Sequence, residues 1–247
     1  MELIGALIAG CAIGSVLGFV GAGGAMLTVP ILVYGFGYPP HQASVAAIAV
    51  VIVAAISGLY PRYKNGEVLI KEALIISALG IFANIGAAQL VRNISDDVLI
   101  TGFSAVIIFA GLTMLRNPVK APEKSIPIPT LVFLSLVIGS LTGFFGIGGG
   151  FLAIPVLVLA FNTPQNKAAG TSLLIIILNS CIALLAHKSA WGEINWKVPL
   201  FMGLSAVIVG TFAGHKSAKT NPAILRKSFA ALLFAIATFT LIETWFL

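Results

Sequence analysis

Long apolar runs separated by short charged gaps constrain this chain more than any other sequence feature. Each run approaches the roughly 20 residues that a helix needs to cross a bilayer. Hydrophobic residues make up 59% of the 247, charged residues 9%, and the mean hydropathy is +1.07. The runs lack the two-residue alternation of a membrane β-barrel, so the pattern predicts an all-α integral membrane protein embedded in a lipid bilayer.

The excess of basic residues does not indicate nucleic-acid binding. The net charge is +6, but the Lys and Arg residues are dispersed and are not interleaved with aromatic side chains. His41, His187 and His215 have no metal-ligand spacing, and no nucleophile paired with a base and no phosphate-binding loop is present. We therefore expect no cofactor, no bound metal, no nucleic-acid partner and no enzymatic activity.

The chain contains an internal repeat. The stretch "IGSVLGFVGAGGAMLTVPILVYGFGYPPHQA" from Ile13 aligns without gaps with "IGSLTGFFGIGGGFLAIPVLVLAFNTPQNKA" from Ile138. A polar elbow repeats as well, as "GEVLIK" from Gly66 and "GEINWK" from Gly192. Duplicated halves with several hydrophobic segments each are typical of secondary transporters. The repeat predicts two membrane units, residues 1–125 and 126–247.

The paired blocks "GAGGAMLTVPIL" and "GIGGGFLAIPVL", with "AAGTSLL" following the second from Ala168, resemble the TauE/SafE family of sulfite and organosulfonate exporters. The resemblance covers essentially the whole chain. It implies a permease for small sulfur-containing anions, without naming the substrate. The first half departs from the pattern, because it has Val45, Ala46 and Ala47 where the second half has "GTS".

The glycine blocks have two physical interpretations. Pairs spaced as in G-x-x-x-G, such as Gly14 with Gly18 and Gly139 with Gly143, suit close packing of straight helices. The nearly adjacent glycines of "GAGG" and "GIGGG" instead favour a break, because each is weaker than Ala in a helix by about 1 kcal/mol. A break at membrane depth leaves backbone N–H groups free at the start of the next half-helix, and protein or a water-filled cavity must surround it.

The basic residues discriminate between these interpretations. Eight straight spans would divide the 14 Lys and Arg residues 8 to 6 between the two sides. If residues 3–37 and 128–162 each form a re-entrant hairpin that returns to the side it entered, the division becomes 11 to 3. Since Lys and Arg prefer the cytoplasm, we predict two inverted repeats, each a Gly-broken re-entrant helical hairpin plus three transmembrane helices, with both termini outside.

This arrangement predicts glycine loops near the bilayer midplane, where free N–H groups and helix dipoles bind oxyanions without a charged side chain. The candidate substrate-binding residues in these blocks are Gly21, Gly23, Gly24, Ala25, Gly146, Gly148, Gly149 and Gly150. Polar residues inside apolar runs add Thr171, Ser172, Asn179 and Asn84. Each of these four side chains has an alternative role, a hydrogen bond to a neighbouring helix.

Charged residues fall at the ends of the predicted segments, so a proton relay through a buried carboxylate has no candidate. A membrane potential that is negative inside favours the exit of one negative charge by about 2.3 kcal/mol per 100 mV, which is sufficient for facilitated efflux. A cation site built from backbone carbonyls is the alternative. We expect an exporter in a bacterial or archaeal plasma membrane; the other candidates are an anion channel and a membrane scaffold that transports nothing.

Overall fold

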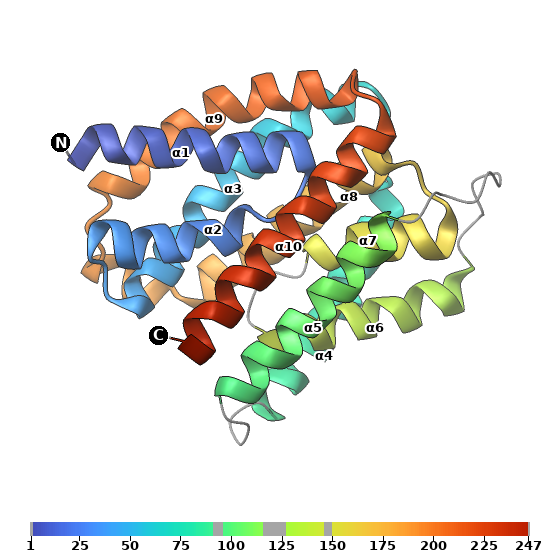
Figure 1. Cartoon of the computed structure of the whole chain (residues 1–247), viewed down its shortest axis with the longest axis horizontal. Helices are drawn as coiled ribbons and strands as arrows, with labels where there is room; N and C mark the ends of the chain where they lie inside the picture. Colours follow the sequence, from blue (N-terminus) through green and yellow to red (C-terminus); the bar gives the residue numbers. More distant parts are fainter. Residues whose placement is uncertain (1, 91–95, 116–126, 146–149, 247) are drawn as a thin grey trace.

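The protein is a bundle of helices (Figure 1). The computed structural model describes residues 2–90, 96–115, 127–145 and 150–246, and no β-strand occurs in these ranges. The predicted all-α fold is confirmed. The helices are α1 (Glu2–Val20), α2 (Gly24–Pro30), η1 (Ile31–Gly35), α3 (Pro40–Lys64), α4 (Ile70–Leu90), α5 (Asp96–Leu115), α6 (Ile128–Phe145), α7 (Gly150–Phe161), α8 (Gln165–Ala186), η3 (Lys188–Glu193), α9 (Lys197–Ala218) and α10 (Pro222–Phe246).

Six helices in the described part of the chain are long and apolar enough to cross a membrane, namely α1, α3, α4, α8, α9 and α10. Large apolar side chains on the outside of the bundle are exposed, among them Phe82, Phe109 and Phe212, each about seven-tenths exposed. A water-soluble protein would bury such side chains, whereas lipid solvates them. The chain is a multi-pass membrane protein.

The first hairpin consists of α1, a short loop and the helical arm formed by α2 and η1. The break falls at the glycines, since α1 ends at Val20 and α2 begins at Gly24. Gly21 and Gly23 have φ angles of 87° and 88°, in the left-handed region that favours glycine. Pro30 lies where the arm changes from α-helix to π-helix, which is consistent with the backbone hydrogen bond that a proline removes.

The two arms of this hairpin run back alongside each other, so that both ends lie on one side of the bundle (Figure 1). A Cβ atom built on Gly5, near the start of α1, would be 3.5 Å from the ring of Phe36, which directly follows η1. The Tyr38 hydroxyl then donates a hydrogen bond of 2.5 Å to the carbonyl of Asn195, between η3 and α9. We call this side, which includes the start of α1, the Tyr38 end.

The opposite side, which we call the Arg62 end, gathers the last turns of α3 and α9 and the first turn of α8. Arg62 on α3 contacts the carbonyl of Asn166 on α8 and the hydroxyl of Ser217 on α9. At the Tyr38 end, the rings of His41 and His187 lie 6.2 Å apart, at the start of α3 and the end of α8. Thus α3 and α8, which correspond in the sequence repeat, run antiparallel to each other.

Antiparallel counterparts are what an inverted repeat requires, although the inversion of the complete halves stays a prediction. The ends of the helices also separate the described basic residues. The Arg62 end carries Arg62, Lys64, Lys71, Lys167, Lys216, Lys219, Arg226 and Lys227, and the Tyr38 end carries Lys188 and Lys197. The four remaining basic residues, Arg92, Arg116, Lys120 and Lys124, lie outside the described residues.

Glycines bring α1 and α9 into backbone contact. Cβ atoms built on Gly10, Gly14 and Gly18 would overlap the backbone of Met202, Ala206 and Gly210 respectively. The matching order of these contacts means that the two helices are parallel. The same contact recurs between α4 and α6, where a Cβ on Gly139 would overlap the carbonyl of Gly80. Because α1 and α4 belong to the first repeat and α6 and α9 to the second, the repeats are interleaved and not two separate bundles.

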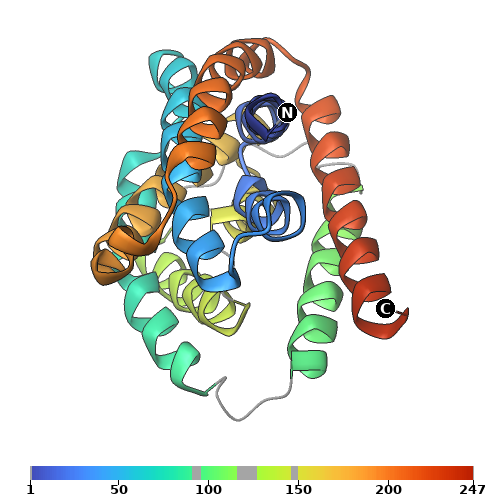
Figure 2. The same ribbon diagram turned by 90° about the vertical axis from the view of Figure 1, so that its left-hand side faces the viewer.

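Two clusters of buried apolar side chains form the core. One is centred on α1, α3 and α9 and includes Leu17, Val50 and Met202. The other is centred on α4, α5, α6, α7 and α10 and includes Ile107 and Phe229. Residues of α8 belong to both clusters, so α8 joins the two parts of the bundle, while α5 and α10 pack together at one edge (Figure 2).

The first glycine loop lies closer to one end of the bundle than the predicted midplane position. The carbonyls of Gly18 and Phe19, directly before the loop, contact side chains in the last turns of α3 and α9. The reason is that the glycine-mediated contact with α9 keeps α1 helical for 19 residues, a rise of about 28 Å. The corresponding loop of the second repeat, residues 146–149, is outside the described residues.

The glycine contact between α1 and α9 can be tested by substitution. Gly14→Ala should destabilise the protein strongly, because the added methyl group overlaps the backbone of Ala206 and forces α1 away from α9. Gly86→Ala on α4 is the matched control, since nothing lies within 4 Å of a Cβ there, and it should be neutral or stabilising by up to about 1 kcal/mol. Thermal unfolding in detergent measures both, and equal midpoints would show that the close contact is dispensable.

Candidate functional site

The predicted glycine site of the first repeat is a buried loop. Gly21, Gly23 and Gly24 are all buried. A Cβ on Gly21 would lie 2.5 Å from the Cβ of Ala169 on α8, and a Cβ on Gly23 would lie 2.6 Å from the side chain of Leu232 on α10. Both positions therefore require glycine for two reasons, the left-handed φ angle and the lack of space.

The segment "AAGTS" of the second repeat lies beside this loop. Ala169 contacts Gly21, as described, and a Cβ on Gly170 would overlap the carbonyl of Glu67 in the connection between α3 and α4. Candidate residues from both repeats thus meet: the glycine block of the first and the first two turns of α8 in the second. This proximity could not be derived from the spacing along the chain.

The hydroxyl of Thr171 is engaged with the backbone. It donates to the carbonyl of Lys167 at 2.7 Å and accepts a hydrogen bond of 3.0 Å from the N–H of Leu69. Thr171 therefore holds the connection between α3 and α4 against α8, which corresponds to the helix-bonding alternative. Ser172 is also fully buried, next to it on α8.

The remaining candidates are placed as follows. Asn179 lies on α8, half-buried, and its side-chain oxygen is buried with no hydrogen-bond partner among the described residues. Asn84 is half-buried on α4, about 20 Å along that helix from the end that contacts Thr171, so the structure does not bring it to the glycine loop. Ala25 is in the first turn of α2 and Gly150 is the first residue of α7. Gly146, Gly148 and Gly149 lie outside the described residues.

Arg62 is the polar residue that the sequence analysis missed. Its position at a segment end marks it as a topology determinant, but the structure buries its side chain completely. Its Nη2 atom lies 3.2 Å from the Gly18 carbonyl, 3.1 Å from the Phe19 carbonyl and 2.5 Å from the Ser217 hydroxyl. Nη1 donates to the Asn166 carbonyl at 3.1 Å. One guanidinium thus connects α1, α3, α8 and α9.

Ser217 completes the arrangement at the end of α1. Its hydroxyl donates to the Phe19 carbonyl at 2.6 Å and accepts from Arg62. The last carbonyls of a helix have no partner within the helix, and they carry the negative end of its dipole. A buried cation and a hydroxyl from other helices supply the missing donors here.

The polar cluster around Arg62 keeps further hydrogen-bonding capacity. Asn166 donates through its side-chain amide to one carboxylate oxygen of Glu67 at 3.1 Å. Within the described residues, the Arg62 Nε, the second Glu67 oxygen, the Asn166 side-chain oxygen and both amide atoms of Gln165 are buried without a partner. Buried polar atoms in native proteins are almost always satisfied by protein, water or a ligand, so this cluster is suited to bind polar molecules.

A weak sequence signal for Arg62 exists. It stands within "YPRYKNGE", at the end of an apolar run that is longer than a bilayer requires, with a proline directly before it. Its exposed neighbour Lys64 has the same charge and lies two residues further on. Nothing in the sequence alone distinguishes the buried cation from the exposed one.

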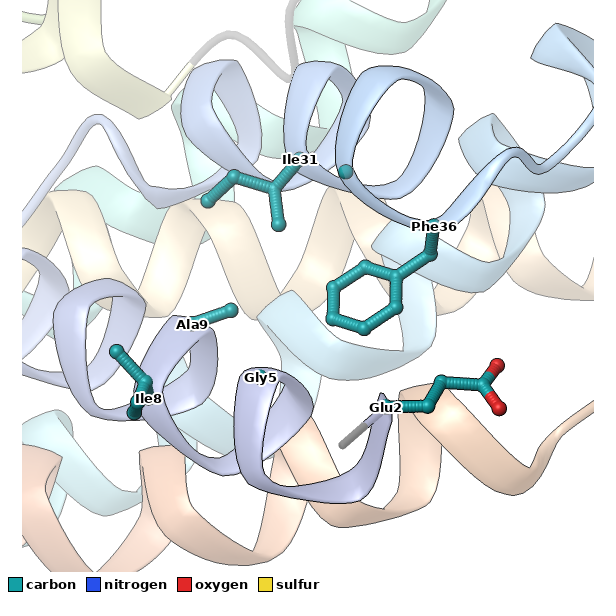
Figure 3. Close-up of a pocket in the computed structure, with 7 residues that line it drawn as sticks. Glu2, Gly5, Ile8, Ala9, Ile31 and Phe36 are labelled. Atoms are coloured by element: carbon teal, nitrogen blue, oxygen red, sulfur yellow. The ribbon is translucent and has the colours of Figure 1, made fainter.

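A separate pocket of about 710 Å³ lies between the hairpin arms at the Tyr38 end (Figure 3), lined by Glu2, Gly5, Ile8, Ala9, Ile31, Gly35 and Phe36. It is mostly apolar, and its one charged group is the Glu2 carboxylate, which disfavours an anion. Burial, together with Glu2, raises the pKa of the neighbouring Tyr38, so this phenol stays neutral and remains a hydrogen-bond donor. This pocket is at the opposite end of the hairpin from the glycine loop.

Metal-ligating side chains do not cluster in the part of the chain that the structure describes. Across residues 2–90, 96–115, 127–145 and 150–246, no three His, Cys, Asp or Glu side chains come together in a way that could hold a metal ion. The described groups near the glycine loop are backbone amides, hydroxyls, side-chain amides, the Glu67 carboxylate and the buried Arg62 guanidinium.

Comparison with known proteins gives a consistent result. The family model described as "Sulfite exporter TauE/SafE" matches residues 6–240. A "Probable membrane transporter protein" of Xylella fastidiosa (strain Temecula1) is 27% identical over 99% of this chain and 97% of its own length. The "Probable membrane transporter protein YdhB" of Bacillus subtilis is 29% identical over 91% of this chain and 94% of its own length.

No solved structure matches this chain significantly. The family match covers nearly the whole chain, and both relatives align along most of their own length. These matches are to membrane transporters and not to enzymes. The glycine blocks and the "AGTS" segment that carry the sequence resemblance lie inside the matched range. The chain belongs to the TauE/SafE family of membrane transporters.

Proposed function

We propose that this protein moves small sulfur-containing anions, such as sulfite, sulfoacetate or related organosulfonates, out of the cell across the cytoplasmic membrane by alternating access. The observation that carries this proposal is the meeting of the first glycine loop with α8 of the second repeat, at Gly21 and Ala169. A site shared by two repeats is the arrangement that rocking of one repeat against the other requires.

The proposed substrate site consists of the two glycine loops and the start of α8. Backbone N–H groups at the beginning of the helical arms would bind the oxygens of a sulfite or sulfonate. In the first repeat the arm that starts at Gly24 continues through η1 to Gly35, and no side chain caps its first turn. Thr171 supports the site indirectly, since its hydroxyl fixes the connection between α3 and α4.

Facilitated efflux is the mechanism that we favour, because the membrane potential alone drives an anion outward. The alternative, a coupling cation bound by free backbone carbonyls, has less support at the first loop. The carbonyls of Gly18 and Phe19 are already bonded by Arg62 and Ser217. A cation placed there would also be repelled by the guanidinium.

An anion channel and a scaffold without transport are the other candidates, and counterflow discriminates between them. In proteoliposomes, unlabelled sulfite or sulfoacetate on the far side should accelerate the entry of labelled substrate, since a carrier returns faster when loaded. A channel shows flux without this acceleration, and a scaffold shows no flux. Liposomes without protein are the control, and a panel of sulfite, sulfate, thiosulfate and short sulfonates identifies the substrate.

The proposed orientation places the Arg62 end in the cytoplasm. Of the described basic residues, eight lie at that end and two at the Tyr38 end, which fits the preference of Lys and Arg for the cytoplasm. A reporter fused after Leu247 should therefore be external, and a reporter inserted after Asn65 should be cytoplasmic. If the two reporters are found on the same side, the proposed five crossings between Asn65 and the C-terminus, by α4, α5, α8, α9 and α10, would be wrong.

The glycine loop itself can be tested at Gly23. Gly23→Ala should lower substrate affinity at least tenfold in correctly folded protein, because a side chain at φ 88° strains the loop and meets Leu232. Gly37→Ala is the matched control: it also has a positive φ, of 69°, but nothing lies within 4 Å of its Cβ and it is remote from the loop. Equal affinities for sulfite in the two variants, measured by calorimetry, would remove Gly23 from the site.

A further inference from the structure

We propose that Arg62 is the residue that positions the first glycine loop and gives it a preference for anions. This role rests on the proposed transport function. The guanidinium of Arg62 is completely buried and is bonded to the carbonyls of Gly18 and Phe19, shortly before the loop.

The two helix ends that meet at the loop have opposite polarity. The C-terminal end of α1 carries roughly −0.5 of an elementary charge, and the N-terminal end of the arm that begins at Gly24 carries roughly +0.5. Because three residues separate them, their fields largely cancel at the loop. Helix dipoles alone therefore give a broken hairpin little preference between anions and cations.

Arg62 removes this cancellation. Its guanidinium bonds the Gly18 and Phe19 carbonyls, which neutralises the negative end of α1 and leaves positive charge beside the loop. The Ser217 hydroxyl donates to the same Phe19 carbonyl and so leaves no free lone pair directed at the loop from that side. The charge of a buried guanidinium persists over the physiological pH range.

The guanidinium also retains a donor. Its Nε is buried without a partner among the described residues, as are the side-chain amide atoms of Gln165 on α8. The structural contacts of Arg62 therefore leave its Nε–H donor without a partner among the described residues. The nearby Glu67 carboxylate accepts a hydrogen bond from Asn166 and offsets part of the guanidinium charge on the side of α8.

Among the described residues, the position of the second repeat that corresponds to Arg62 is not buried. The elbow "YKNGEVLIK" follows Arg62 directly, whereas in the second repeat the residue before the corresponding elbow is Lys188, which is exposed. The charge preference is thus built into one end of the bundle, the end at which the basic residues gather. An anion approaching from that side would meet the buried charge first.

The role can be tested by changing charge and shape separately. Arg62→Gln and Arg62→Met remove the charge, and Arg62→Lys keeps the charge without the planar fork. Lys64→Gln is the matched control, since it removes the same charge from an exposed position two residues away. The measurements are KM and maximal rate for sulfite counterflow in proteoliposomes, and hydrogen exchange of residues 15–24, which include the Gly21 N–H bonded to Leu17.

We expect both uncharged variants to raise KM at least tenfold and to accelerate exchange in residues 15–24, with Arg62→Lys intermediate and Lys64→Gln unchanged. Ser217→Ala should accelerate the exchange with a smaller change in KM, because it leaves the guanidinium in place. A normal KM in either folded uncharged variant, or an Arg62→Lys variant no better than Arg62→Gln, would overturn the charge role. If neither uncharged variant folds, hydrogen exchange in Arg62→Lys decides. Unchanged exchange in residues 15–24 overturns the proposal whatever the KM, and faster exchange supports it.

Counterflow tests the proposed transport, and hydrogen exchange tests the positioning role of Arg62 separately. If wild-type protein shows no sulfite or sulfonate counterflow, the proposed transport is wrong. The exchange measurement still reports whether Arg62 holds the loop in place. Normal exchange in residues 15–24 of Arg62→Lys and Ser217→Ala would then refute the positioning role on its own.

Discussion

The structure depends on satisfying the backbone of a helix that ends inside the membrane protein. Lipid offers no hydrogen bonds, so the last carbonyls of α1 need donors from the protein itself. Arg62 and Ser217 supply them from α3 and α9. Removing the guanidinium would take a donor from both carbonyls, although Phe19 would keep the Ser217 hydroxyl. A buried carbonyl left unsatisfied costs about 1–3 kcal/mol. This one contact joins the end of α1, directly before the glycine loop, to α3, α8 and α9.

Small residues determine how closely the helices approach one another. Glycines on α1 lie against the backbone of α9, and Gly139 on α6 lies against Gly80 on α4 in the same way. Helices gain no hydrophobic driving force from each other in lipid, so close backbone packing provides much of the stabilisation. Since each contact joins one repeat to the other, the two halves stabilise each other and neither forms a complete core. In the alternating access that we propose, movement of one repeat against the other would occur along these glycine contacts.

The two interpretations of the glycines are both correct, for different glycines. Gly14 and Gly18 lie in a continuous helix and allow close packing, whereas Gly21 and Gly23 lie in the break. The hydroxyl of Thr171 resembles a substrate ligand in sequence, but it is bonded to the Lys167 carbonyl and to the N–H of Leu69 in the connection between α3 and α4. In a bundle with few polar side chains, backbone groups that leave regular helices use the available hydroxyls first.

Composition and pattern alone predict the lipid solvent, the helical secondary structure, the duplication, the family and the helix break of the first repeat. These features depend on local composition and periodicity: apolar runs must be helical in lipid, and nearly adjacent glycines destabilise a continuous helix. Three further facts come from the packing of the helices. The glycine loop meets Ala169, α1 remains helical almost to the far end of its neighbours, and Arg62 is buried while Lys64 is exposed. Those facts depend on which helices are neighbours, and contacts between residues more than 100 positions apart leave no local pattern in one sequence.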